Sequence, residues 1–422
     1  MALTLLFINP PIYDFTAYDF WLKPYGLLKI AGSLMQHKIH YFNFLGENYK
    51  KNTKEDGRGK FIKLEIVKPS VFSDIPNPFF RYGAPKEEFE NFLKNANAPD
   101  IVFITSSMTY WYLGVKEVIE TVRKIYPKTK IVLGGIYATL TPEHAGKLEV
   151  DIVVKGKDLS SVEKLLGFEL EDPAANWSLE KNSRYGVITI STGCPFSCSY
   201  CAIKRFDNGF SFRKNETIEK EISSLQKAGI QNIAFYDDAL LYKFEEGLGK
   251  FLDAVSDKNF YFHTPNGIHV RFISKDIAIA LKKANFKTLF LSLESSDERF
   301  LRATGNKLQK DDFLSAIENL SLAGFKKEQL NAYILFGHPE ISEETILETI
   351  NFVKTIGIKP FLSEFSPVPG TIDAEKCSKY TDISEPLNHN KLAFSIRSLS
   401  LKKYQKLKSL AKSLKKELSH RR

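Results

Sequence analysis

Three of the chain's four cysteines, Cys194, Cys198 and Cys201, stand in a CxxxCxxC spacing within the stretch STGCPFSCSYCAI. A loop of this length can bring three thiolates onto one small inorganic centre, and no fourth cysteine lies near them in sequence. Three soft ligands with one vacant position suit an iron–sulfur cluster that has an open iron. A structural zinc site is the alternative, but zinc usually takes four protein ligands, and no second CxxC or HxxxH pair is nearby.

The second half of the chain supplies a sheet that positions these cysteines. From Gly186 onward, short apolar runs alternate with helical segments, which predicts a curved parallel sheet or partial (β/α)6 barrel. Barrel chemistry gathers at the carboxyl ends of the strands, and the cysteine stretch directly follows the first strand. We expect strands at Val187–Ser191, Asn232–Tyr236, Phe260–Thr264, Thr288–Leu293, Ala332–Phe336 and Phe361–Phe365.

The first half has an alternating pattern of its own. Its apolar runs are bounded by glycine or proline and interleaved with helices, which predicts a doubly wound parallel sheet. We expect strands at Leu3–Ile8, Ile39–Leu45, Ile101–Thr105, Ile131–Leu133 and Ile152–Val154. The expected helices are Tyr25–Gln36, Tyr112–Ile125 and Ser160–Leu166, with a shorter helix after Thr141.

The CxxxCxxC spacing with an aromatic residue, here Tyr200, before the last cysteine resembles the radical S-adenosylmethionine (radical SAM) superfamily. The resemblance extends to about Ser400. It implies a 4Fe-4S cluster whose open iron chelates the amino and carboxylate groups of SAM. An electron from a donor such as flavodoxin or ferredoxin then cleaves SAM to methionine and a 5′-deoxyadenosyl radical, which abstracts hydrogen from substrate.

The ends of the predicted strands match the positions at which this superfamily holds SAM. Asp237 and Asp238 occupy the ammonium position, where a carboxylate accepts charge-assisted hydrogen bonds, although both are also suited to cap a helix. Arg271 either holds the methionine carboxylate or forms an ion pair at a helix start. Asn266 and His269 precede it in the same turn.

Three further turns complete the expected SAM pocket. Ser292 and Glu294 stand in the ribose position, and the Ser-Ser-Asp that follows also suits a helix cap. Gly337 and Pro367 lie in turns that the superfamily places beside the adenine. His338 is either a general acid or a hydrogen-bonded spectator. The resemblance implies a SAM contact for Tyr200 as well, and no catalytic residue is assigned.

The first half resembles the flavodoxin-like, cobalamin-binding-type domain that precedes the core in one branch of the superfamily. The matching stretches are INPP, PYGLLKIAGSL, VLGGIYATLTPEHA and DIVVKGKDLSSVEKLL. The DxHxxG motif, whose histidine ligates cobalt, is absent, so no cobalt ligand is assigned. The domain either binds cobalamin without it or serves packing or substrate recognition. The implied cobalamin contacts are Asn9, Pro10, Gly134, Gly135 and Ile136.

We expect four segments along the chain. These are a first domain over 1–167, a linker over 168–185, the radical SAM core over 186–375 and an extension over 376–422. Residues 47–97, rich in glycine, proline and aromatics, are long for a connection between sheet elements. They predict a packed loop that folds over the interdomain cleft.

The formal charge of +9 is concentrated at the end of the chain. Lys402–Arg422 contains nine Lys or Arg and one Glu, so the rest is nearly neutral and does not support a broad nucleic-acid-binding face. The recurrence of Leu407, Ala411, Leu414 and Leu418 predicts an amphipathic helix. That basic helix is either docked with a solvated lysine face or in contact with membrane, RNA or an acidic partner.

The composition indicates which class of protein this is and which cellular compartment suits it. A hydrophobic content of 43% and a charged content of 26% are typical of globular proteins, and no apolar run of about 20 residues predicts a membrane span. The opening MALTLLFINPP lacks a basic start and predicts a strand, not a signal peptide. Few cysteines, clustered in ligand spacing, favour a reducing cytoplasm. The cluster also favours anaerobic conditions.

We therefore expect a cytoplasmic radical SAM enzyme that acts on a small molecule or peptide. If cobalamin binds, C-methylation or cyclisation is expected; without it, hydrogen abstraction is. Methylthiotransferase chemistry is disfavoured because the extra cluster cysteines are lacking. The alternative is a non-catalytic metal-containing module that binds RNA or membrane through the basic tail.

Overall fold

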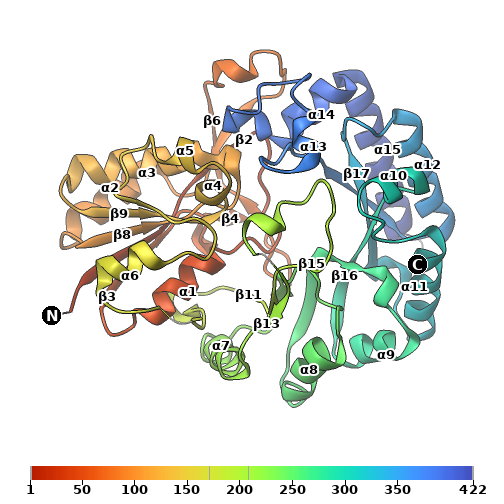
Figure 1. The fold of residues 1–422 in the computed structure, drawn as a ribbon, viewed down its shortest axis with the longest axis horizontal. Coiled ribbons are helices and arrows are strands. Elements are labelled where there is room, and N and C mark those ends of the chain that lie inside the picture. Colours follow the sequence, from red (N-terminus) through yellow and green to blue (C-terminus); the bar gives the residue numbers. More distant parts are fainter. Residues whose placement is uncertain (1, 171, 208, 421–422) are drawn as a thin grey trace.

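The computed structural model describes residues 2–170, 172–207 and 209–420, and each half contains a parallel sheet (Figure 1). The N-terminal sheet has the order β10-β9-β8-β1-β3. In β1, Leu6 and Ile8 pack with α2 and α3, whereas Leu5 and Phe7 pack with α1 and α6. Both faces are therefore covered, which confirms the doubly wound sheet.

The elements of the N-terminal half have the following bounds: β1 (Thr4–Asn9), β2 (Ile12–Asp14), α1 (Tyr25–Ser33), β3 (Lys38–Asn43), β4 (Lys50–Lys51), β5 (Lys60–Phe61), β6 (Lys63–Ile66), β7 (Phe79–Tyr82), α2 (Lys86–Asn95), β8 (Ile101–Ile104), α3 (Tyr112–Ile125), β9 (Lys130–Leu133), α4 (Gly135–Leu140), α5 (Pro142–Ala145), β10 (Ile152–Val153) and α6 (Ser160–Leu166).

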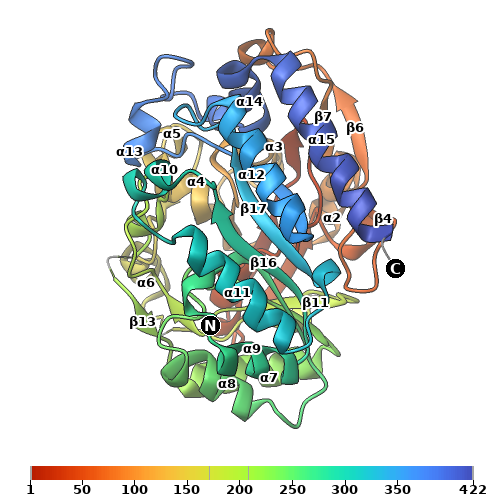
Figure 2. The ribbon, with the colours of Figure 1, turned by 90° about the vertical axis from the view of Figure 1, so that its right-hand side faces the viewer.

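The second half is a partial barrel with helices on its outer side (Figure 2). Its six parallel strands follow chain order, β11-β14-β15-β16-β17-β18, and all six predicted strands are present. Their bounds and those of the covering helices are β11 (Tyr185–Ile188), α7 (Asn215–Lys227), β14 (Asn232–Phe235), α8 (Lys250–Ala254), β15 (Tyr261–His269), α9 (Lys275–Lys283), β16 (Phe286–Glu294), α10 (Glu298–Ala303), α11 (Lys310–Leu322), β17 (Leu330–Phe336), α12 (Glu343–Ile356) and β18 (Lys359–Glu364).

The segment 47–97 differs from the expected loop, because much of it is regular structure. β4 and β5 form an antiparallel pair, and β6 and β7 extend β2 into a three-stranded antiparallel sheet. Helix α2 buries Phe89 and Leu93 against the N-terminal sheet. Glycine and proline mark turns between short strands here, and the four-residue spacing of Phe89 and Leu93 carries the helical signal that the composition obscured.

Two aromatic residues of the N-terminal half fill the barrel interior. The Phe20 ring centroid lies 5.0 Å from that of Phe290 and 5.6 Å from that of Phe361. Trp21 is fully buried beside it, with a φ of 56° and with its carbonyl accepting a hydrogen bond from Tyr236. The halves therefore share one continuous apolar core.

The expected linker over 168–185 is packed between the halves. Trp177 is fully buried, and the carboxylate of Glu180 lies 2.6 Å from Lys23 Nζ and accepts hydrogen bonds from Tyr41 and Asn43. A buried charge needs such partners. Its polar composition therefore reflects a buried ionic contact between the linker and the N-terminal half.

The C-terminal extension ends in α14 (Lys391–Leu399) and α15 (Leu401–His420). The apolar face predicted for α15 is confirmed, because all four of its spaced residues are buried along β18 and α12 (Figure 2). Three of its lysines pair with carboxylates of the barrel, namely Lys403 and Lys406 with Glu343 and Lys408 with Glu364. Arg421 and Arg422 lie outside the described residues. No helix in the described part is both long and apolar enough to cross a bilayer.

Replacing Trp21 tests the shared core. Trp21→Ala should lower the free energy of unfolding by about 3–5 kcal/mol, because it removes a large, fully buried side chain. Urea denaturation of the metal-free protein measures the loss. Tyr18→Ala, at a side chain that is 37% exposed, should change stability by about 0.5 kcal/mol or less. Equal losses in both variants would contradict the assignment of Trp21 to the core.

Candidate active site

The CxxxCxxC residues lie in a loop at the carboxyl end of β11. The short antiparallel pair β12 (Ser191–Thr192) and β13 (Ser211–Phe212) closes its base. Gly193, just before the first cysteine, has a φ of 73°, and a Cβ there would overlap the carbonyl oxygen of Gly209. Only glycine accommodates both the left-handed backbone and this close approach.

The three thiols share one neighbourhood, because the thiols of Cys194 and Cys198 both act electrostatically on Cys201. A structural zinc ion takes four protein ligands, and no fourth cysteine lies near these three in sequence. A cluster with an open iron takes three thiolates, each through a different iron. The three cysteines therefore fit a 4Fe-4S cluster better than zinc.

Charge around the thiols also bears on cluster binding. Burial raises the pKa of all three, that of Cys201 to about 11, although the ligand form is the thiolate. Lys307 opposes this effect at Cys194 and Cys198. Its Nζ lies 3.3 Å from Glu294 Oε1. Sequence reasoning missed Lys307, because it follows α10 in a loop without a recognisable motif.

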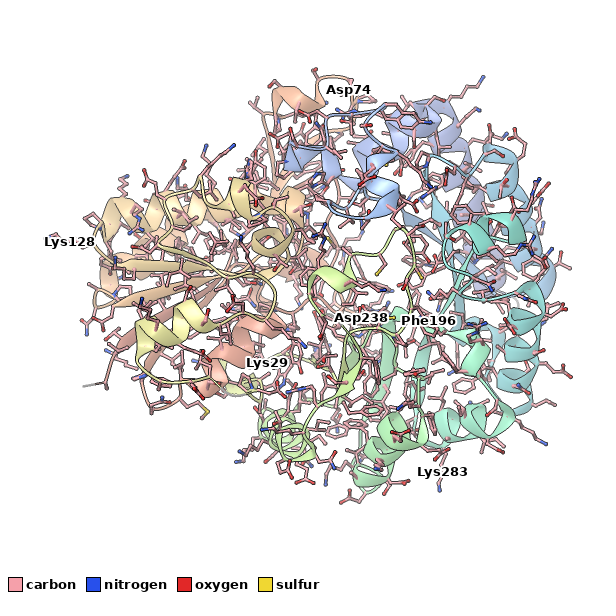
Figure 3. The ribbon with its side chains drawn as sticks, viewed as in Figure 1. Lys29, Asp74, Lys128, Phe196, Asp238 and Lys283 are labelled. Carbon is pink, nitrogen blue, oxygen red and sulfur yellow. The ribbon has the colours of Figure 1, made fainter. Side chains whose placement is uncertain are left out.

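The loop packs closely onto the ends of the barrel strands. Phe196 stacks on His269 with ring centroids 4.5 Å apart, and Figure 3 shows Phe196 near the centre of the molecule. The backbone N–H of Ser199 donates to the Thr304 carbonyl at 3.2 Å. Tyr200 is partly buried, and its side chain partly offsets the raised pKa of the Cys198 thiol.

The adjacent carboxylates Asp237 and Asp238 have different surroundings. Asp237 is buried and accepts hydrogen bonds from the N–H groups of Ile190, at 3.1 Å, and Ser191, at 2.7 Å, and from the Ser191 hydroxyl. It therefore anchors the strand that enters the cysteine loop. Asp238 is exposed and lies near Phe196 in the view of Figure 3, and its pKa is raised to about 7 by desolvation, followed by repulsion from Asp237 and Asp207.

Neither carboxylate caps a helix in the described structure. Asp238 is the one whose carboxylate is available to an ammonium group, because the oxygens of Asp237 are already occupied. The SAM contact predicted for this pair stays a prediction.

The ends of β15 and β16 bring several of the predicted SAM residues together. The Asn266 amide donates to the Tyr236 carbonyl at 2.8 Å. Ser292 is buried, and a Cβ on Gly267 would lie 2.8 Å from its Oγ. Glu294 has a φ of 64°, a strained conformation for this residue that the surrounding structure must hold. Asp297, after it, caps α10 as expected.

Two basic residues in this region have unused hydrogen-bonding capacity in the described structure. His269 is 6% exposed, and its Nδ1 has no hydrogen-bond partner. Desolvation, with smaller contributions from Lys307 and Arg271, lowers its pKa to about 2, so the ring is neutral. Arg271 is exposed, and no described hydrogen bond or ion pair engages its guanidinium. Both can therefore accept a polar ligand.

The predicted adenine contacts are buried by packing. Gly337 has a φ of 81°, a Cβ there would overlap the Ser395 hydroxyl, and its carbonyl accepts a hydrogen bond from Ser398 at 2.8 Å. Pro367 is also buried. Contact with α14 accounts for the glycine, and the adenine contact stays a prediction.

Two further side chains near the strand ends, His338 and Glu364, are engaged by neighbouring groups. His338 is buried with both ring nitrogens hydrogen-bonded, which favours the spectator over the general acid. Glu364 accepts a hydrogen bond from Tyr404 of α15 at 2.6 Å, so its carboxylate is engaged by that helix.

The carboxyl edge of the N-terminal sheet carries the predicted cobalamin contacts. Asn9 and Pro10 line a shallow hollow with Ser106, Ser107 and Trp111. The turn Gly134–Ile136 lies at the same edge, where Gly135 has a φ of 90° and Ile136 is 36% exposed. Backbone without side chains beside an exposed apolar residue fits a large, flat, mostly apolar ring.

The carboxyl edge of the N-terminal sheet lies close to the edge of the barrel that carries the cysteine loop. Lys157, just after β10, pairs with Asp207 of the segment that follows the cysteines. A Cβ on Gly156 would lie 3.5 Å from the Phe206 carbonyl oxygen. The carboxyl end of the N-terminal sheet therefore meets the cysteine-bearing segment of the barrel.

Comparison with known proteins agrees with this arrangement. Residues 188–353 match the Radical SAM superfamily, and residues 79–166 match the B12 binding domain. An uncharacterized methyltransferase of Pyrococcus horikoshii is 24% identical over 322 residues, or 65% of this chain and 68% of that protein. A threonylcarbamoyladenosine tRNA methylthiotransferase of Thermotoga maritima is 25% identical over 61% of this chain and 64% of its own. The chain thus spans about two thirds of the length of these relatives.

Two solved structures share the fold. The radical S-adenosylmethionine methyltransferase TsrM from Kitasatospora setae, with tryptophan substrate and a SAM analogue bound, has a TM-score of 0.64 at 13% identity, covering 90% of this chain and 77% of its own. The cobalamin-dependent S-adenosylmethionine radical enzyme OxsB, with aqua-cobalamin and SAM bound, has a TM-score of 0.55 at 11% identity, covering 98% and 62%.

A cysteine loop at the barrel edge and a glycine turn at the opposing sheet edge thus fall within two matched domains. The chain contains a radical SAM domain over residues 188–353, preceded by a B12-binding domain over residues 79–166. It is a radical SAM enzyme, and its cofactors are a 4Fe-4S cluster and SAM, with cobalamin supported by the second domain. Cys194, Cys198 and Cys201 are the residues that fit the cluster.

Asp237 should make stability depend on pH. Burial raises its pKa from 3.8 to about 6, so between these values the native state holds a proton that the unfolded state has lost. Stability contributed by Asp237 therefore falls as pH rises from about 4 to 6. Asp237→Asn should flatten this part of the profile, as measured by urea unfolding of the metal-free protein. An unchanged slope would count against a protonated, buried Asp237.

Proposed function

We propose that this chain is a cobalamin-dependent radical SAM methyltransferase that transfers a methyl group to an unactivated carbon. The observation that carries the proposal is the approach of the two sheet edges. The cysteine loop and the Gly134–Ile136 turn belong to different sheets, and the Lys157–Asp207 ion pair joins the segments next to them. A substrate between the edges would face both cofactor sites. A ring-forming reaction is the second outcome that the same arrangement supports.

Each group of residues has a defined task in this proposal. When bound, the cluster, SAM and cobalamin supply electron transfer, radical generation and methyl transfer. The exposed Asp238 binds the SAM ammonium and the unpaired Arg271 binds its carboxylate, through charge-assisted hydrogen bonds. Glu294 accepts from the ribose hydroxyls. Phe196 and His269 cover this side of the loop with stacked rings and limit the access of water.

Methyl transfer is favoured over methylthio transfer by the cysteine count. The chain has four cysteines, and none precedes Cys194, so a second cluster has no thiolate ligands in the N-terminal half. The likeness to tRNA methylthiotransferases is therefore assigned to the shared radical SAM core.

The partners follow from the same chemistry. The substrate class proposed is a small molecule or a peptide, and the electron donor is a protein of the flavodoxin or ferredoxin type. The reducing cytoplasm is the compartment that suits free cysteines clustered in ligand spacing. A module that binds RNA or membrane through its tail has less support, because α15 is docked by its apolar face and three of its lysines pair with barrel carboxylates.

Cluster binding is tested by a cysteine replacement. Cys198→Ser should leave the anaerobically reconstituted protein with little iron and lower SAM cleavage by at least about 100-fold, because one of three thiolates is lost. Iron content, absorbance and 5′-deoxyadenosine release measure the effect. Cys377→Ser is the matched control, since Cys377 is buried and its thiol donates to the Asp373 carbonyl, a bond that serine can keep. A wild-type protein that binds zinc and ignores SAM would overturn the proposal.

Cobalamin binding is tested at the exposed turn. Ile136→Glu should weaken binding of hydroxocobalamin at least about tenfold, because it places a charge where an apolar ring would lie. Since Ile136 is 36% exposed, the change should leave the thermal unfolding temperature near that of wild type. Spectroscopic titration under anaerobic conditions measures affinity. Equal affinity in both proteins would remove Ile136 from the site, and no binding in either would remove cobalamin from the proposed reaction.

A further inference from the structure

A buried polar network holds the cysteine loop between its second and third cysteines. Asp373, which lies in the short helix α13 (Ile372–Glu375), is fully buried. Its Oδ2 accepts a hydrogen bond from the Ser199 hydroxyl at 2.6 Å, and its backbone N–H donates to the Ser199 carbonyl at 3.2 Å. Ser199 lies in the stretch that joins Cys198 to Cys201. Asp373, which follows β18, therefore fixes both the side chain and the backbone of Ser199.

His338 orients the Asp373 carboxylate. It is 1% exposed, and its Nδ1 accepts a hydrogen bond from the Glu340 backbone N–H at 3.1 Å. The ring proton is therefore on Nε2, which donates to Asp373 Oδ2 at 3.0 Å. Phe300 and Phe365 pack edge-on against the imidazole, with ring centroids 5.1 and 4.7 Å away, so its orientation is fixed by contacts on two sides.

A metal ion is a poor occupant for this group, although its ligand atoms are close. The ligand atoms of His338, Glu340 and Asp373 lie within 4.8 Å of one another. However, Nε2 of His338 already donates to Asp373. Lys376 Nζ lies 2.7 Å from Glu340 and 3.0 Å from Asp373 Oδ1, so an ammonium group already occupies the place of a cation, and the two carboxylates with one ammonium keep a net negative charge. The arrangement is that of a hydrogen-bonded support.

We propose that His338 and Asp373 are positioning residues that hold the cluster-binding loop in its ligand geometry through Ser199. The proposal rests on the proposed function, because it requires the loop to carry a cluster. His338 lies in the turn after β17, and Asp373 lies in the segment after β18. The last two strands of the barrel therefore fix the shape of the cysteine loop, which follows the first strand, β11. Partners outside the ligand sphere orient ligands in this way in other metal sites and tune the potential of the cluster.

The negative charge on Asp373 should also affect the reduction potential of the cluster. A fixed negative charge near the loop opposes the addition of an electron to the cluster. Removing it should therefore raise the reduction potential, whereas a loss of packing alone has no reason to shift the potential in that direction.

The experiment uses the full chain, reconstituted anaerobically with iron and sulfide. Asp373→Asn, Ser199→Ala and His338→Leu should each lose iron to a chelator about tenfold or more faster than wild type. Asp373→Asn should also raise the reduction potential of the cluster in EPR-monitored titration. His338→Gln should behave like wild type, since a glutamine amide can accept from Glu340 and donate to Asp373. Ser199→Ala removes one hydroxyl from a loop and puts folding at little risk.

Asp14→Asn is the matched control. Asp14 is 1% exposed and its carboxylate accepts hydrogen bonds from Trp111 and Asn390, so the change neutralises a comparably buried carboxylate away from the cysteine loop. It should leave both iron loss and the potential at their wild-type values.

Three results would overturn the proposal. The first is iron loss and a potential equal to wild type in all the loop variants, with the wild-type cluster intact. The second is an equal acceleration in Asp14→Asn, which would assign the effect to general destabilisation. The third is a wild-type protein that takes up no iron, and this result alone overturns the proposed function as well.

Discussion

A cluster needs three thiolates held close together in a fixed geometry, and the structure around the cysteine loop is organised by this requirement. The loop that carries them cannot hold such a geometry alone, because its thiols are partly buried and like charges repel. It is closed at its base by Gly193, anchored at its start by Asp237 and held in its middle by Asp373. Lys307 supplies a positive charge from a fourth direction. Asp237, Lys307 and Asp373 lie in segments that follow β14, α10 and β18, so a barrel, which brings these segments to one edge, suits the task.

Buried groups also hold the two halves of the molecule together. Buried aromatic rings of the N-terminal half lie inside the barrel, and Glu180 of the linker forms a buried ion pair with Lys23 of the N-terminal half. A buried ion pair is costly to break, since each partner would be left uncompensated. The separation between the cysteine loop and the Gly134–Ile136 turn is therefore maintained by the core itself, and a reaction that uses two cofactors gains a fixed geometry.

The sequence allowed much of this to be predicted, because periodicity and motif spacing are local signals. The six barrel strands, the doubly wound sheet, α15 and the cysteine loop were all identified from neighbouring residues. Lys307 and Asp373 were not, since they reach the loop only through the fold, and Asp373 is 174 residues from Ser199. The segment 47–97 was misjudged because its turns dominate its composition. Gly337 shows a converse case, in which a motif position has a packing explanation that only the structure provides.

Burial of Phe20 and Trp21 inside the barrel has a consequence for biosynthesis. These residues leave the ribosome well before Phe361, against which Phe20 packs. Domains usually fold in order as they emerge. Here the first domain must keep Phe20 partly uncovered until β18, the last barrel strand, is available, and Trp21 uncovered until β15 and β16 are made. Protection of the nascent chain by a chaperone would matter most during that interval.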